Sequence, residues 1–358
     1  MEEDFVLMKG NEALAEAAIR AGADGYFGYP ITPQSEVMEY LTAAKPWERT
    51  GMVVLQAESE VSAINMLYGG AGAGKRVMTS SSSPGISLMQ EGISYIAGAE
   101  LPVVVANVVR GGPGLGTIQP SQSDYFQATK GGGHGDYHLL VLAPSSVQEM
   151  ADFMPLAFDL AFKYRNPVMI LSDGAIGQMM EKVKFQPQRP RMKDEELPDW
   201  ATTGKKPDRE RNIITSLDLD PYRQERFNRK LIEKYQKMKE EEVRYETFQC
   251  EDAEYLFVAY GTSSRICQKS VQLAREKGIK AGLFRPITLF PFPEKQVGAL
   301  ADQVRGMLSV EMSAGQMVED VRLATNGKVP VEHYGRMGGV IPTPDEIVEV
   351  LIQKFIGG

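Results

Sequence analysis

The first half of the chain alternates short apolar runs with segments in which apolar residues recur at helical spacing. Residues 53–55 form one such run, and from Val61 onward the apolar residues recur at helical positions. The stretch 101–109 is nearly continuous Val and Ala, which is typical of a parallel strand buried on both faces. Further strands are expected near Asp24, Arg76, Leu139 and Val168. Such repeated alternation predicts a doubly wound, mostly parallel α/β sheet.

The length of 358 residues suggests two domains joined by a linker. The predicted sheet occupies residues 1–184. Residues 185–252 contain many prolines and charges, together with a charged helix near 222–243, and are expected to form a linker that wraps a neighbouring surface. A second, smaller α/β domain is expected over residues 253–358.

Composition excludes several classes of function. The net charge of -8 and the pI near 5.2 argue against a nucleic-acid partner, which requires a basic face. No apolar run is long enough to cross a membrane. The acidic residues 1–4 are unlike a signal peptide, so a cytoplasmic location is expected. Cys250 and Cys267 are too few to hold an iron–sulfur cluster, and with only three histidines we expect no metal site in this chain.

Side chains suited to chemistry follow four successive strands. In a doubly wound sheet, ligands lie beyond the carboxyl ends of the strands, where the turns into the helices converge. Thr32, Glu60, the serine run 80–83 and Arg110 each follow one of these strands, so we expect them to share one edge of the sheet. The loop 111–124 is rich in Gly, Pro and Ser, which is typical of a binding loop on a rigid scaffold.

Each of these residues also has a purely structural interpretation. Glu58 and Glu60 flank Ser59, a suitable helix N-cap, so both carboxylates could simply favour the helix dipole. Thr32 lies between prolines and could cap the next helix. Arg110 could be a surface residue held in an ion pair.

Three other motifs are interpreted as structural. The serine run lacks the pattern of a phosphate-binding loop and indicates close backbone packing. The glycines at 69–74 close a predicted helix, whereas a dinucleotide fingerprint opens one, so a nicotinamide-dependent dehydrogenase is disfavoured. His134 and His138 fit a turn with solvated histidines better than a catalytic pair, although the sequence does not fix their roles.

Taken together, the ordered motifs resemble the alpha-type subunit of 2-oxoacid:ferredoxin oxidoreductases. The resemblance covers nearly the whole chain and rests on the segments 29–33, 56–60, 79–85, 110–116, 120–124, 133–136 and 285–293. It implies a pyrimidine-type thiamine diphosphate-binding domain followed by a transketolase C-terminal-like domain. Within the family, segments 6–12 and 111–120 look most like those of the branched-chain enzyme.

That resemblance implies decarboxylation of 2-ketoisovalerate (3-methyl-2-oxobutanoate) to acyl-CoA, CO2 and reduced ferredoxin. The 2-oxoglutarate enzyme is the near alternative, and a non-catalytic assembly subunit is a second one. Thiamine diphosphate would be shared with a separate beta-type subunit, which binds the diphosphate, Mg2+ and an iron–sulfur cluster. Gamma and ferredoxin-like delta subunits are compatible with this assembly, in which coenzyme A and ferredoxin are the other reactants.

The resemblance also implies roles for named residues. Glu60 matches the carboxylate that touches the aminopyrimidine ring of the cofactor. Thr32 matches a hydroxyl near the substrate carbonyl, and Arg110 matches a cation near the substrate carboxylate. The expected cofactor contacts, besides Glu60, are Pro30, Ile31, Ser83, Pro84 and Gly85.

Overall fold

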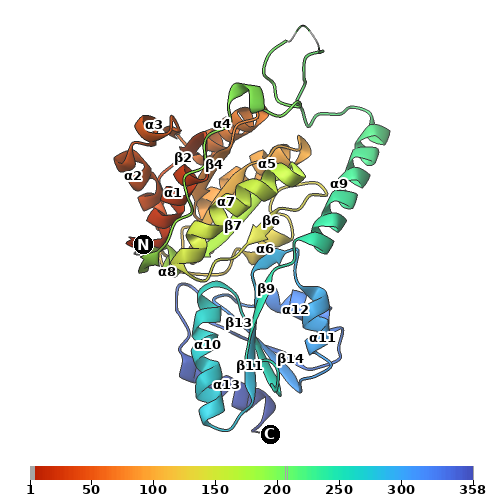
Figure 1. Ribbon diagram of the computed structural model, residues 1–358. Coiled ribbons are helices and arrows are strands. Elements are labelled where there is room, and N and C mark those ends of the chain that lie inside the picture. Colours follow the sequence, from red (N-terminus) through yellow and green to blue (C-terminus); the bar gives the residue numbers. More distant parts are fainter. Residues whose placement is uncertain (1–4, 206, 208, 358) are drawn as a thin grey trace.

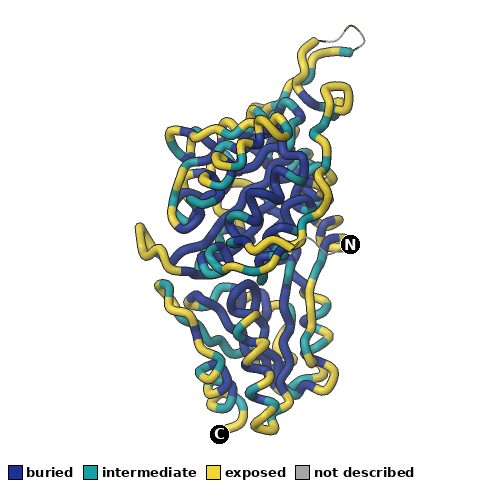
Figure 2. Tube along the Cα trace, turned by 60° about the vertical axis from the view of Figure 1, so that its left-hand side comes forward, coloured by how far each residue is buried: buried dark blue, intermediate teal, exposed yellow. Residues whose placement is uncertain are grey.

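The computed structural model describes residues 5–205, 207 and 209–357. It contains two α/β bodies stacked end to end, with helix α9 lying along the side of the first (Figure 1). Both bodies have buried interiors, whereas the segment around residue 205 is largely exposed (Figure 2). The acidic residues 1–4, on which the cytoplasmic prediction depended, lie outside the described residues.

The first body is built on a seven-stranded sheet with strand order β12-β6-β7-β5-β4-β2-β3. All its strands are parallel except β12, so the predicted doubly wound, mostly parallel sheet is confirmed. Every residue of the central strand β5 is buried, as its Val-rich sequence predicts. The strands are β2 (Gly25–Gly28), β3 (Val53–Gln56), β4 (Val77–Ser81), β5 (Val104–Val109), β6 (Leu140–Leu142), β7 (Val168–Asp173) and β12 (Thr288–Phe290).

The helices of this body form two packed groups. In one group α1 packs against α2 and α7, and in the other α4 packs against α5. Ser59 caps α4 by accepting a hydrogen bond from the Ser62 backbone N–H at 3.2 Å. The helices are α1 (Gly10–Arg20), α2 (Ser35–Ala44), α3 (Pro46–Arg49), α4 (Glu60–Gly72), α5 (Ser83–Gly98), α6 (Tyr125–Thr129), α7 (Val147–Tyr164) and α8 (Gly174–Gln178).

The second body is a five-stranded sheet with order β14-β13-β10-β11-β9. Its edge strand β9 lies within the stretch expected to be a linker and pairs antiparallel with β11. Helix α10 packs against α13, and α11 packs against α12. The elements are β9 (Tyr245–Phe248), β10 (Tyr255–Val258), α10 (Gly261–Glu276), β11 (Ala281–Pro286), α11 (Glu294–Leu300), β13 (Gly306–Glu311), α12 (Met317–Thr325), β14 (Val331–Gly335) and α13 (Pro344–Phe355).

The two bodies share buried polar contacts and one strand. Strand β12 leaves the second body and pairs antiparallel with β6 at the edge of the first sheet. Gln122, which is 2% exposed, donates from Nε2 to the Tyr260 carbonyl at 2.8 Å and accepts at Oε1 from Ser263 and from the Met312 N–H. These satisfied buried groups fix how the second body sits on the loops of the first.

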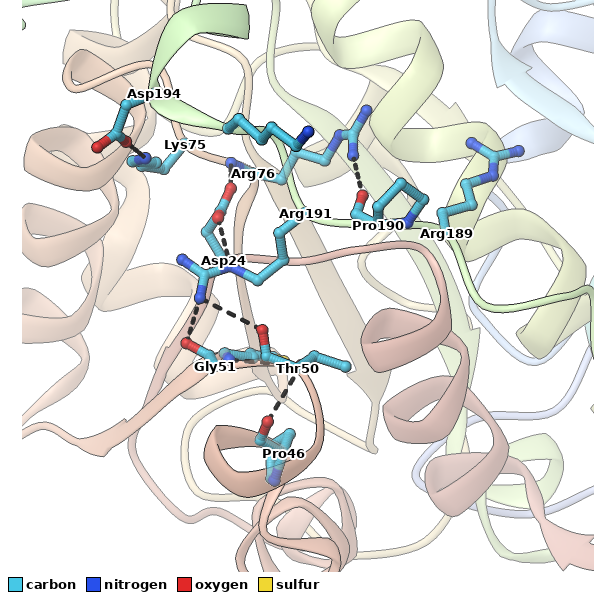
Figure 3. Close-up of polar contacts among 12 residues, drawn as sticks. Asp24, Pro46, Thr50, Gly51, Lys75, Arg76, Arg189, Pro190, Arg191 and Asp194 are labelled. Carbon is cyan, nitrogen blue, oxygen red and sulfur yellow. Dashed lines mark hydrogen bonds and ion pairs between the residues drawn. The ribbon is translucent and has the colours of Figure 1, made fainter.

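Part of the stretch predicted to be a linker packs against the first body. Arg191 donates from Nε to the buried Asp24 carboxylate at 2.7 Å, and Asp24 also accepts from the Arg76 N–H at 2.8 Å (Figure 3). Lys75 pairs with Asp194, which lies in the 3-10 helix η1 (Asp194–Glu196). Farther along, α9 (Pro221–Glu241) buries Leu231, Tyr235 and Met238 on one face, and Phe227 on the same face is half-buried.

Besides β9 and β12, two other short strands were not predicted from the sequence. β1 (Val6–Lys9) and β8 (Met180–Val183) form a separate antiparallel pair. Their residues are partly exposed, and the two strands lie far apart in the sequence, so neither has a local signature beyond a few apolar residues.

Candidate functional site

The four side-chain positions predicted to share one edge of the sheet do so. Strands β5, β4, β2 and β3 are consecutive in the sheet and parallel, so the turns that follow them meet at their carboxyl ends. Thr32 follows β2, Glu60 follows β3, Ser83 follows β4, and Arg110 directly follows β5.

Glu60 is the first residue of α4, and its side chain turns toward α5. The residue is 6% exposed, and no residue in the described part of the chain donates a hydrogen bond to its carboxylate. Gly85 makes this placement possible, because a Cβ atom there would lie 2.7 Å from Glu60 Oε1 and 2.0 Å from Ser81 Oγ. The site therefore contains a buried carboxylate whose hydrogen-bonding capacity is left for a ligand.

Arg110 is also buried, at 8% exposure, which excludes the interpretation as a surface ion pair. Its guanidinium donates to the carbonyl of Thr32 at 2.9 Å and to that of Leu115 at 3.1 Å. Among the described residues, no carboxylate forms an ion pair with it. A fixed guanidinium fork without a counter-ion suits a planar anion such as a carboxylate.

Thr32 lies on an exposed turn and does not cap the next helix, since the N-cap of α2 is Gln34. Three side chains hold this turn in place by hydrogen bonds. Asn11 Nδ2 and Gln178 Nε2 donate to the Pro33 carbonyl at 2.7 and 3.0 Å, and Ser80 donates to Gln34 Oε1 at 2.6 Å. On the same turn Pro30 is exposed and Ile31 is half-buried.

The start of α5 contacts both Arg110 and Glu60. Ser83 Oγ accepts from the Arg110 N–H at 3.1 Å and lies 3.2 Å from the Arg110 carbonyl, while Gly85 lies against Glu60. Several buried polar atoms at the ends of β4 and β5 lack partners among the described residues: Thr79 Oγ1, Ser81 Oγ, Ser82 Oγ, Asn107 Oδ1 and Arg110 Nε. Such a concentration of unpaired buried groups is unusual in a packed sheet and indicates a ligand site.

A groove of about 770 Å³ begins at Ser83 and Pro84 and runs between the two bodies. Asp124 lines it and accepts a hydrogen bond from Asn107 Nδ2 at 2.9 Å. Burial raises the pKa of Asp124, although hydrogen bonds from Asn107 and Ser83 oppose that rise. Asp124 belongs to the predicted binding loop 111–124 and to the family segment 120–124, but no role was predicted for it. Asn11 and Gln178, which clamp the Thr32 turn through the Pro33 carbonyl, were not predicted as site residues. Asn11 lies in the segment 6–12 that carries part of the resemblance, and Gln178 lies in none of those segments.

The two histidines of the 133–138 region lie away from this site. His134 is exposed in a turn, its carbonyl accepting a hydrogen bond from Ser94. His138 stacks on Phe290 with ring centroids 4.2 Å apart, and burial lowers its pKa. Neither histidine lines the groove or contacts Glu60 or Arg110.

The described residues include no group of three or more His, Cys, Asp or Glu side chains placed to hold a metal ion. They also include no helix that is both long and apolar enough to cross a membrane. The candidate site offers a ligand the Glu60 carboxylate, the Arg110 guanidinium and serine and threonine hydroxyl groups.

Two known protein families match successive parts of this chain. Residues 16–247 match the family described as "Pyruvate flavodoxin/ferredoxin oxidoreductase, thiamine diP-bdg", and residues 253–347 match "Pyruvate:ferredoxin oxidoreductase core domain II". The chain belongs to the pyruvate flavodoxin/ferredoxin oxidoreductase family. The resemblance inferred from the ordered motifs is thereby confirmed.

Within this family, the chain is 52% identical over 345 residues to the ketoisovalerate oxidoreductase subunit VorB of Methanothermobacter thermautotrophicus, covering 96% of each chain. It is 38% identical to the 2-oxoglutarate synthase subunit KorA of Archaeoglobus fulgidus, covering 97% of this chain and 99% of that one. The branched-chain relative is thus the more similar of these two.

A solved structure of 2-oxoglutarate:ferredoxin oxidoreductase from Magnetococcus marinus, with 2-oxoglutarate, coenzyme A and succinyl-CoA bound, superposes with a TM-score of 0.84 at 28% identity. The match covers 98% of this chain and 65% of that longer chain. A split-gene transketolase in an inactive tetramer matches with a TM-score of 0.61 at 13% identity, covering 98% of each chain, which indicates a shared fold alone.

Proposed function

We propose that this chain is the 2-oxoacid- and pyrimidine-binding subunit of a thiamine diphosphate-dependent oxidoreductase. It converts 2-ketoisovalerate to acyl-CoA and CO2 and passes the electrons to ferredoxin. The observation that carries the proposal is the buried Glu60 carboxylate, which has no hydrogen-bond donor among the described residues and lies at the same edge of the sheet as the unpaired cation of Arg110. The 52% identity to a ketoisovalerate oxidoreductase subunit supports the choice of substrate.

The residues present fit the pyrimidine half of the cofactor. Glu60 would meet a ring nitrogen, and Pro30, Ile31, Ser83, Pro84 and Gly85 would surround the ring. When bound, thiamine diphosphate supplies the carbanion and the electron sink that decarboxylation requires. The Glu60 carboxyl group would hold a ring nitrogen by a hydrogen bond, a contact that would favour the basic tautomer of the aminopyrimidine. Burial excludes the water that would compete for this contact.

Substrate binding follows from the other two residues. The Arg110 fork binds the 2-oxoacid carboxylate, in a charge-assisted pair about twice as strong as a neutral hydrogen bond. The Thr32 hydroxyl, on a turn clamped to β4 and α8, donates to the substrate carbonyl oxygen. These two contacts would orient the 2-oxoacid and polarise its carbonyl carbon.

A second chain must complete the site. We propose that a beta-type subunit binds the diphosphate, Mg2+ and an iron–sulfur cluster, as the resemblance to the alpha-type subunit implies. Gamma and delta subunits and a cytoplasmic location complete this proposal. Residues 1–184 would form the pyrimidine-binding domain, residues 185–252 the linker, and residues 253–358 the domain for subunit contacts.

The test is 2-oxoacid-dependent reduction of a viologen dye by the co-expressed complex under anaerobic conditions. Glu60→Gln should lower turnover by at least about 100-fold, since it removes the acidic proton. Glu58→Gln is the matched control, because Glu58 is exposed beside the same helix start. Wild type should prefer 2-ketoisovalerate over 2-oxoglutarate. Full activity of Glu60→Gln would refute the site, and a preference for 2-oxoglutarate would refute the substrate.

A further inference from the structure

We propose that Glu36 is a positioning residue for the 2-oxoacid, because its carboxylate fixes the two amide side chains that hold the Thr32 turn. The inference rests on the proposed function, since it explains how a proposed substrate contact is kept in place. It assigns a role in substrate binding to a helix residue that acts only through its neighbours.

Four hydrogen bonds connect two amide groups to two oxygen atoms behind the Thr32 turn. Asn11 Nδ2 and Gln178 Nε2 donate to the Pro33 carbonyl at 2.7 and 3.0 Å. Each also donates to Glu36 Oε2 at 2.8 Å. An amide nitrogen carries two hydrogens, so both amides use their full donor capacity in these bonds. We call Asn11, Gln178 and Glu36 together the clamp.

The Glu36 carboxylate determines which way each amide of the clamp faces. An ionised carboxylate only accepts hydrogen bonds, so a neighbouring amide must present its NH2 group to it rather than its carbonyl oxygen. With the nitrogen so oriented, the second hydrogen of each amide reaches the Pro33 carbonyl. An amide turned the other way would place its oxygen against that carbonyl, and two acceptors without a hydrogen between them repel each other. Glu36 thus sets the orientation that the turn requires.

The neighbours of Glu36 keep it ionised. Burial raises the pKa of Glu36, but hydrogen bonds from Asn11, Gln178 and Lys9 and the positive charge of Lys9 outweigh burial and lower it. Lys9 Nζ donates to Glu36 Oε1 at 3.2 Å and to Gln178 Oε1 at 3.5 Å. Lys9 therefore occupies one carboxylate oxygen and leaves the other to the two amides.

A role in the helix dipole alone does not account for this carboxylate. Glu36 lies in the first turn of α2, where an acidic side chain is favourable. Its oxygens, however, accept from side chains of β1, α1 and α8, and among the described residues no backbone N–H donates to them. Asn11 is fully buried, so an N–H that lost Glu36 as its acceptor would not reach water instead.

The clamp affects both proposed substrate contacts through two adjacent residues. It holds the carbonyl of Pro33, while Arg110 donates to the carbonyl of Thr32 at 2.9 Å. A movement of the turn would shift the Thr32 hydroxyl and would also disturb a hydrogen bond that orients the Arg110 guanidinium. Loss of the clamp should therefore weaken the binding of the 2-oxoacid.

The clamp is tested first without turnover, by hydrogen–deuterium exchange in the co-purified complex. Glu36→Met removes both acceptor oxygens, and Glu39→Met, at an exposed position of the same helix, is the matched control. The Gln34 and Val37 amides each donate to a backbone carbonyl at 3.0 Å. Their exchange should be at least about tenfold faster in Glu36→Met and unchanged in Glu39→Met. Wild-type exchange in Glu36→Met would overturn the clamp, whether or not the proposed reaction is correct.

The positioning role is tested by steady-state dye reduction. Glu36→Met should raise the KM for 2-ketoisovalerate at least about tenfold. Glu36→Gln, which retains one acceptor oxygen, should stay within about threefold of wild type. Gln178→Met breaks the same clamp from the opposite side, so the double variant with Glu36→Met should have a KM no higher than that of the worse single variant.

Two results would overturn the positioning role of Glu36. One is a wild-type KM in Glu36→Met, and the other is a KM in the double variant that equals the product of the two single effects. Absence of 2-oxoacid-dependent reduction in the wild-type complex would instead refute the proposed function, and the exchange measurement would still decide whether Glu36 holds the turn.

Discussion

Gly85→Ala would move the Glu60 carboxylate without removing it. A Cβ atom at position 85 would lie 2.0 Å from Ser81 Oγ, 2.7 Å from Glu60 Oε1 and 3.0 Å from Glu60 Cγ. Contacts this short force both side chains to shift, and Ser81 is fully buried and has little room. The substitution therefore tests whether the position of Glu60, rather than its presence alone, is needed for activity.

Two opposing terms set the effect on stability. Alanine favours a helix over glycine by about 1 kcal/mol, whereas an extra methyl group in a packed interior costs about 1–3 kcal/mol. With a contact of 2.0 Å the second term should dominate, so we expect a net loss of about 1–2 kcal/mol in the free energy of unfolding. Displacement of a catalytic group by even about 1 Å can lower turnover roughly 100-fold.

The assay compares Gly85→Ala with Gly69→Ala in the co-purified complex. Gly69 lies on the exposed side of α4 and has no atom within 4 Å of a Cβ placed there, so its substitution should raise stability by up to about 1 kcal/mol and leave turnover unchanged. Thermal unfolding and dye reduction are measured for both variants. Adding Ser81→Gly to Gly85→Ala removes the shortest contact and should restore part of the lost stability. The reasoning fails if Gly85→Ala is as stable and as active as Gly69→Ala.

Three further outcomes follow from single contacts. Arg110→Lys keeps the charge but loses the fork, so the KM for the 2-oxoacid should rise at least about tenfold in steady-state assays; an unchanged KM would exclude a carboxylate contact. Asp24→Ala removes the buried partner of Arg191 and should lower the free energy of unfolding by about 3 kcal/mol with turnover retained, and a loss below 0.5 kcal/mol would contradict this. Burial raises the pKa of Glu100, but two lysines of α9 outweigh burial and lower it. The contribution of Glu100 to the free energy of unfolding is therefore present above pH about 4.3 and is lost as the pH falls through the lower folded pKa. Glu100→Gln should reduce the loss of thermal stability at acid pH, and a pH dependence identical to that of wild type would refute the pairing with the lysines.

The sequence allowed the sheet of the first body to be predicted because its strands carry their signals locally. The Val-rich run before Arg110 and the helical spacing after Glu60 each specify one element, and the rule for parallel sheets then brings the two residues to one edge. Strand β12 could not be predicted in the same way. It belongs by sequence to the second body, yet it pairs antiparallel with β6 of the first sheet, and that pairing depends on contacts between distant segments.

The same distinction applies to the site. Glu60 and Arg110 were predicted from their positions at strand ends, whereas the clamp on the Thr32 turn was not. Asn11 and Gln178 are separated by 167 positions in the sequence, yet both donate to the Pro33 carbonyl and to Glu36 Oε2. An asparagine at the start of a helix ordinarily indicates a cap, so its long-range contact is visible only once the chain has folded.

The unpaired groups of the site have an energetic consequence for the protein without its cofactor. A buried carboxylate and a buried guanidinium that lack an ionic partner each lower the stability of the folded chain, because neither regains the hydration that it loses on burial. A cofactor whose ring nitrogen hydrogen-bonds with Glu60 and a substrate anion that binds Arg110 would supply those partners, so both ligands would bind the folded state in preference to the unfolded one. The polar groups that destabilise this edge of the sheet would thus be the source of its affinity for these ligands. Glycine at position 85 stabilises the helix less than alanine would. It leaves the room that Glu60 needs to lie where the pyrimidine ring would bind.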